Sequence, residues 1–230
     1  GRWPWPRGRY AELINAIGAA KPHRQVHDFM FPEQSDPKED AKPAAAIAEN
    51  PNVSLGYFLR AGARDGQLED IRPLPMFRRN AELATIAFRY NYANEVWTIP
   101  HAVRRENEMI PSLASVISGV RRPSEQDFRV NYSIQPTSIP KVSAVDLLEG
   151  RIDPGRMTGK TVVVGPTSVR LGDQYMLPGW GQAGGVYIHI IGAETLKAGR
   201  PVDLGWLPAF LLAALTAVAT VRLGGRRAAA

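Results

Sequence analysis

The chain has 230 residues, a net charge of +6 and no cysteine. The lack of cysteine excludes disulfides, thiol catalysis and metal sites with cysteine ligands. A hydrophobic content of 44% is enough for one sizeable core, or for a core domain with a membrane tail. The arginines are scattered and not interleaved with aromatic residues, so we expect no binding of nucleic acid.

The first part of the chain alternates predicted helices with predicted strands. Apolar residues at i, i+3, i+4 and i+7 predict a helix over 10–17, and V-H-D-F-M-F at 26–31 predicts a strand that contains Asp28. We expect the next helix to begin with Asp40 as its N-cap, and a second strand to follow over 52–59. This order of elements favours a parallel sheet.

The middle of the chain predicts an inserted β-hairpin. Residues 84–92 alternate in polarity, which is typical of a half-buried strand, and 96–99 can return antiparallel to it. The pattern then predicts a helix with Pro111 in its first turn, a strand over 128–132 and a short helix capped by Ser143.

The stretch from 158 to 199 carries the clearest pattern. Three consecutive valines at 162–164 predict a strand that is buried on both faces, as in a parallel sheet covered by helices. A long loop over 165–185 is dense in glycine and proline, which is where α/β folds often hold ligand groups. Apolar residues at helical spacing then predict a helix over 186–198 that ends at Gly199.

The run from Leu204 to Val221 contains no charged residue. Its length is close to the roughly 17–20 residues that a membrane helix needs, and the arginines that follow it place that end in the cytoplasm. The sequence therefore predicts an extracytoplasmic domain over 1–200, a transmembrane helix over 204–222 and a cytoplasmic start over 223–230. A buried core helix is the alternative, which Gly205 and Pro208 allow.

Polar residues follow two of the predicted parallel strands, where α/β sheets bind their ligands. The candidate ligand-binding residues are Asp28, Thr167, Ser168, Asp173 and His189. Carboxylates, hydroxyls and an imidazole can bind a small polar ligand or a cation. The alternative is structural: the two aspartates hold the loop through hydrogen bonds, and the histidine is a satisfied core residue.

Several catalytic and metal motifs are missing. The four histidines form no H-x-x-x-H pair, so we expect no metal. The glycine-rich stretch at 155–161 is one residue short of a phosphate-binding loop and precedes a strand rather than a helix. A G-x-S-x-G nucleophile motif is also absent. We therefore expect neither catalytic activity nor a cofactor in this chain.

A series of short motifs resembles one family in its order. The motifs are W-P-W-P-R at 3–7, H-D-F-M-F at 27–31, S-D-P-K-E-D at 35–40, I-P-S-L-A at 110–114, V-N-Y at 130–132, S-A-V-D-L-L-E-G at 143–150, G-K-T-V-V-V-G at 159–165, L-G-D at 171–173 and G-V-Y-I-H at 185–189. They resemble the CHASE domain, type 2, a sensory module of bacterial receptors. The chain departs from that family at 94–98, where an acidic D-x-D-G-x-x-R stretch is usual.

The resemblance implies a sensor rather than an enzyme. Such a domain lies outside the cytoplasmic membrane, follows a membrane helix and first strand that would precede Gly1, and controls a cytoplasmic cyclase, cyclic-di-GMP enzyme or kinase. The resemblance also implies an unknown small ligand or envelope signal and a homodimer. Two other readings stay open: a soluble α/β enzyme with a buried C-terminal helix, and an envelope assembly module without a ligand.

Overall fold

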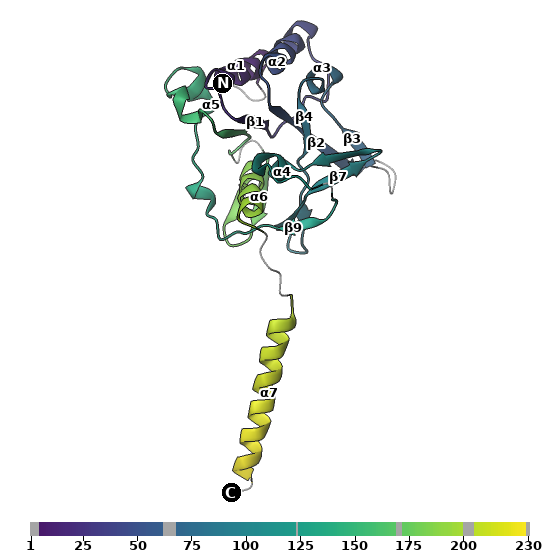
Figure 1. The fold of residues 1–230 in the computed structure, drawn as a ribbon, viewed down its shortest axis with the longest axis vertical. Coiled ribbons are helices and arrows are strands. Elements are labelled where there is room, and N and C mark those ends of the chain that lie inside the picture. The colour runs from purple at the N-terminus through teal and green to yellow at the C-terminus, as the bar shows by residue number, and fades with distance from the viewer. Residues whose placement is uncertain (1–4, 62–67, 123, 169–171, 200–204, 229–230) are drawn as a thin grey trace. The chain divides into compact units, whose positions relative to one another are not determined.

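The structure is a computed structural model, shown in Figure 1, and it forms two compact units, Gly1–Arg200 and Pro201–Ala230. The residues that it describes are 5–61, 68–122, 124–168, 172–199 and 205–228, and for Ala61, Leu68 and residues 223–228 it describes the backbone alone.

The first unit is built on the predicted parallel sheet. Its parallel strands run in the order β10 (Thr161–Val164), β1 (Arg24–His27), β2 (Val53–Ala61) and β4 (Glu82–Thr85). The second half of β2 pairs antiparallel with β3 (Leu68–Ile71). Strand β10 is half-buried rather than buried on both faces, because it lies at the edge of the sheet and pairs only with β1.

Helices cover both faces of this sheet, as Figure 1 shows. Helices α1 (Arg7–Ala19) and α2 (Pro37–Glu49) pack against each other on one face. Helices α4 (Leu113–Ser118) and α6 (Gly185–Ala198) share a core with Val26 on the other face. The predicted α/β architecture is therefore confirmed.

The first helix buries the predicted face, with Leu13 and Ile14 in the core. The start of the second helix differs from the prediction. Asp36, rather than Asp40, is the N-cap of α2, and its carboxylate accepts hydrogen bonds from the N–H groups of Lys38 and Glu39. Pro37 at the first helical position explains the earlier start, because its fixed φ suits that position.

The predicted strand over 84–92 is two strands. Its first part is the end of β4, and its last part is β5 (Arg89–Tyr90), which pairs antiparallel with β6 (Val96–Pro100). The inserted hairpin is therefore confirmed, but it is shorter than predicted. Strand β6 also pairs with β9 (Asp127–Arg129). The sequence did not predict the hairpin of β7 (Ala102–Arg105) and β8 (Glu108–Pro111).

The remaining elements of this unit are short. Pro111 ends β8, and Ser112 caps α4, so the proline lies just outside the helix in which it was expected. Ser143 caps its helix as predicted. These elements are α3 (Pro75–Arg78), η1 (Pro136–Ser138), α5 (Ala144–Leu148) and η2 (Pro154–Met157).

The predicted loop over 165–185 contains a second unpredicted hairpin. Strands β11 (Gln174–Leu177) and β12 (Gly181–Gly184) pair antiparallel, and Gly179 and Gly181 adopt positive φ angles at the turn. The chain enters α6 directly from β12, and Gly199 ends that helix as predicted. The hairpin and the helix are therefore joined directly, without a loop, at Gly184 and Gly185.

The second unit contains one helix, α7 (Leu207–Ala228). It begins later than the predicted apolar run, and its uncharged part, residues 207–221, is only about 22 Å long at ~1.5 Å per residue. Over the described residues, no helix has both the length and the apolar character that crossing a membrane requires. The predicted transmembrane helix over 204–222 is therefore not supported.

Candidate functional site

Asp28 stands at the end of β1 and is buried toward α6. Its backbone N–H donates to the carbonyl of Val164 at 2.7 Å, which extends the β1–β10 ladder past His27. Alternate residues of a strand share a face, so Asp28 lies on the side of Val26, whose core partners come from α4 and α6. Only 7% of the Asp28 side chain is exposed. A carboxyl group is thus enclosed between the sheet edge and a helix.

The position of this carboxyl group is a switch point of the sheet. Strand β1 is followed by α2 on one face, whereas the neighbouring strand β10 leads to α6 on the opposite face. The two connections therefore leave the carboxyl ends of β1 and β10 in opposite directions. Open α/β sheets hold their ligands at such a crevice.

Asp173 lies beside Asp28 and holds the start of α6. Its Oδ2 accepts a hydrogen bond from the N–H of Gly185, the first residue of the helix, at 3.1 Å. The hydroxyl of Tyr175 is hydrogen-bonded to Asp173, and that of Tyr90 to Tyr175. A negative charge at this position is favourable, because a helix N-terminus carries a partial positive charge.

His189 lies one turn into α6 and completes the group. Its Nε2 is 4.0 Å from Oδ1 of Asp28, which is too long for a hydrogen bond. The ring lies against that of Phe88, with 4.6 Å between the centroids, and the residue is 1% exposed. Its Nδ1 has no hydrogen-bond partner among the residues that the structure describes. We call Asp28, Asp173, Tyr175 and His189 the switch-point site.

Burial sets the charges in the switch-point site. Burial, and then the charge of Asp173, raise the pKa of Asp28 to about 8. Burial also raises the pKa of Asp173, despite the hydrogen bonds from Tyr175 and Gly185. Burial lowers the pKa of His189 to about 3. At neutral pH Asp28 therefore holds a proton and His189 is neutral, so their 4.0 Å contact is not an ion pair.

Glycines close the site tightly. A methyl group at Gly165 would lie 2.8 Å from Cβ of Val186, and one at Gly185 would lie 2.8 Å from the ring of Tyr175. At Gly184 it would lie 2.6 Å from the carbonyl oxygen of Pro166. These distances are too short for any side chain, so the closed site has little free space between the sheet edge and α6.

The two hydroxyl residues predicted for the site lie elsewhere. Thr167 and Ser168 follow Gly165 in the loop and are exposed to solvent, whereas the side chains of Asp28 and His189 are buried and Asp173 is half-buried. The structure therefore brings together three of the five predicted residues. Within the described part of the chain, no group of three histidine, aspartate or glutamate side chains is placed to hold a metal ion.

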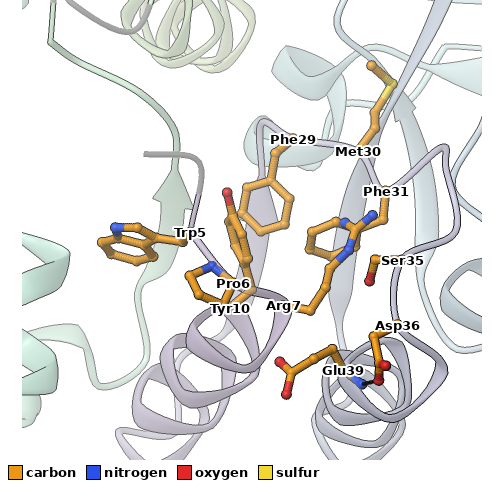
Figure 2. A pocket seen from close by; sticks show the side chains of 10 residues that line it. All are labelled: Trp5, Pro6, Arg7, Tyr10, Phe29, Met30, Phe31, Ser35, Asp36 and Glu39. Carbon is orange, nitrogen blue, oxygen red and sulfur yellow. Dashed lines mark hydrogen bonds between the residues drawn. The ribbon is translucent and has the colours of Figure 1, made fainter. Parts of the chain in front are cut away.

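A separate cleft of about 550 Å³ lies between the starts of α1 and α2, as Figure 2 shows. The guanidinium of Arg7 lies 4.2 Å from the ring centroid of Phe31, and its Nε is 3.2 Å from Oδ1 of Asp40. Asp40 also accepts hydrogen bonds from the N–H and hydroxyl of Ser35. The predicted N-cap residue is thus a buried partner of Arg7. The cleft is lined by Trp5, Pro6, Arg7, Tyr10, Phe29, Met30, Phe31, Ser35, Asp36 and Glu39.

Comparison with protein families identifies a known domain. The family model of the CHASE2 domain matches residues 1–225. The chain belongs to the CHASE2 domain family. No curated protein and no solved structure matches the chain. CHASE2 domains are sensory rather than catalytic parts of membrane receptors, so the resemblance seen in the sequence is confirmed and the soluble-enzyme reading is not supported.

Sequence reasoning missed three aromatic residues around the carboxyl pair of this CHASE2 domain. Tyr175 and Tyr90 are linked by a hydrogen bond, and Phe88 packs against both Tyr175 and His189. Tyr175 stands two residues after Asp173, which directly precedes β11, and this spacing places both side chains on one side of the extended chain. This grouping could be predicted only if 174–184 were recognised as a hairpin. The glycine content of the stretch favoured a loop instead.

Proposed function

We propose that this CHASE2 domain is the extracytoplasmic sensory domain of a bacterial signalling receptor, and that a stimulus at the switch-point site shifts α6. The hydrogen bond from Gly185 to Asp173 carries this proposal. It joins a half-buried carboxyl group to the first residue of the last helix in the first unit. A change at the site therefore acts directly on the end of that helix.

Helix α6 is suited to pass such a change along its length. It is buried on most sides, and it approaches α4 so closely that a methyl group at Gly192 would lie 3.2 Å from Cβ of Ala114. Closely packed helices shift as rigid elements between discrete arrangements instead of deforming gradually. The chain continues from α6 through Gly199 toward the second unit.

The proposal includes an output domain on the cytoplasmic side of the receptor. A nucleotide cyclase, a cyclic-di-GMP enzyme or a kinase is the output that the family resemblance implies. Signalling requires two conformations of the sensory domain with different affinity for the stimulus. The carboxylate at the start of α6 contributes about 1 kcal/mol, which corresponds to about fivefold in the equilibrium between two such conformations.

The substitution Asp173→Ala tests the proposal in an intact receptor that carries this domain. Loss of the carboxylate removes the hydrogen bond from Gly185, so we expect the basal activity of the output domain to change about fivefold. The matched control is Asp153→Ala, which removes an exposed carboxylate that bonds a backbone N–H in η2 and should leave the output unchanged. Equal output from both variants would contradict a sensory role and favour an assembly module without a ligand.

A further inference from the structure

We propose that the ligand of the switch-point site is a proton, and that the domain reports extracytoplasmic pH through a proton that Asp28 holds in the neighbourhood of Asp173. This inference rests on the proposed function and adds the identity of the stimulus. It follows from the groups that face the carboxyl pair, from the closed packing and from the bond to α6.

Of the side chains that the structure describes, those placed around the carboxyl pair are uncharged at neutral pH. Helix α6 contributes His189, which burial keeps neutral, and strands β11 and β5 contribute the hydroxyls of Tyr175 and Tyr90. Among the described residues, no lysine or arginine forms an ion pair with either aspartate. A buried carboxylate beside a second, half-buried one ionises with difficulty when no cation is paired with it, so Asp28 retains a proton.

The packing of the site excludes most other stimuli in this conformation. Methyl groups at Gly165, Gly184 and Gly185 would all lie within 2.8 Å of neighbouring atoms. An organic ligand or a hydrated ion must displace α6 or the β11–β12 hairpin before it reaches Asp28, whose side chain is 7% exposed. A proton reaches the carboxyl group without a cavity.

The sign of the response follows from the titration of Asp28. Its raised pKa, about 8, means that the folded domain holds the proton at pH 6 and releases it as the pH rises through about 8. His189 does not titrate in this window, since its pKa is lowered to about 3. Release adds a second charge beside Asp173, which holds Gly185 at the start of α6. A pKa that differs by one unit between two conformations shifts their equilibrium tenfold.

The test measures receptor output at extracytoplasmic pH 6.0 and pH 8.5 in the intact receptor. We expect at least a threefold difference in the wild type, with a midpoint near pH 8. Asp28→Asn replaces the carboxyl by a neutral group of the same shape, so this variant should stay at the pH 6.0 output at both values. The control Asp153→Asn should respond like the wild type. A pH response that persists in Asp28→Asn would overturn the proposal.

A second measurement needs no variant. Carbon-13 NMR of the aspartate carboxyl groups in the full chain should show one group that titrates near pH 8, and a highest aspartate pKa below 5 would overturn the proposal.

The proposed sensory function and the proposed proton ligand can fail separately. If Asp173→Ala changes the output but pH does not, the proton is the wrong ligand and the sensory role stands. If Asp173→Ala changes nothing, the sensory role itself fails.

Discussion

Replacing Arg7 with methionine should lower the free energy of unfolding by about 3 kcal/mol. Methionine keeps much of the apolar stem of Arg7 but leaves Asp40, whose side chain is 4% exposed, without its cation. A buried charge that loses its partner costs far more than the pair contributed. For a chain of this length the melting temperature should fall by roughly 6–12 °C, which differential scanning calorimetry can measure.

The control for Arg7→Met lies on the same helix. Arg9 forms an exposed ion pair with Glu12, and such pairs contribute little, so Arg9→Met should change stability by at most about 0.5 kcal/mol.

The pH dependence of stability gives a second check on the Arg7–Asp40 pair. Burial opposes ionisation of Asp40, but the hydrogen bonds from Ser35 and the charge of Arg7 hold its pKa below the usual value. Stability from this carboxylate is lost as the pH falls below the usual aspartate pKa, so the difference between wild type and Arg7→Met should narrow there. Equal losses from both arginine variants would contradict the account of this pair.

The substitution Gly165→Ala should destabilise the domain by about 2 kcal/mol. The new methyl group would lie 2.8 Å from Cβ of Val186 and 3.2 Å from Cβ of Asp28, and both atoms are fixed to backbone. The sheet edge and α6 must therefore separate. Chemical denaturation of wild type and variant measures the loss, and the slope of the transition should not change.

Gly8→Ala is the matched control for the substitution at Gly165. Its methyl group would meet side-chain atoms of Glu39 and Lys42, at 3.2 Å and 3.3 Å, and no backbone atom among its nearest neighbours. Alanine also favours a helix over glycine by about 1 kcal/mol, so this variant should be as stable as the wild type or more stable. Equal stability of the two glycine variants would contradict the close packing described between the sheet edge and α6.

Much of the sheet and part of the site could be predicted because they depend on short-range patterns. The three valines of β10 and the 3.6-residue spacing of α6 specify their elements locally. Carboxyl ends of parallel strands share an edge, which is why Asp28, Asp173 and His189 could be grouped in advance. Asp40 was wrongly predicted as the N-cap. An aspartate followed by proline at 36–37 is the stronger start signal, and tertiary burial gives Asp40 its role.

The rest of the site depends on tertiary structure. Burial keeps Asp28 protonated and His189 neutral, and the amino-acid pattern around a residue does not reveal how completely it is enclosed. Tyr90 and Tyr175 belong to two different hairpins and form a hydrogen bond with each other. The hairpin at 174–184 was not predicted, because its glycines favoured a loop. The apolar run before Arg222 looked long enough for a membrane span, but the helix uses only part of it.

A distance measurement between α1 and α6 tests the central claim most directly. The chain has no cysteine, so Glu12→Cys and Lys197→Cys would provide the only two sites for spin labels, and both side chains are exposed. Pulsed electron paramagnetic resonance should show a shift of about 1–2 Å between the otherwise unchanged chain and the Asp173→Ala variant. If the two distance distributions superimpose while Asp173→Ala still alters receptor output, α6 does not carry the signal.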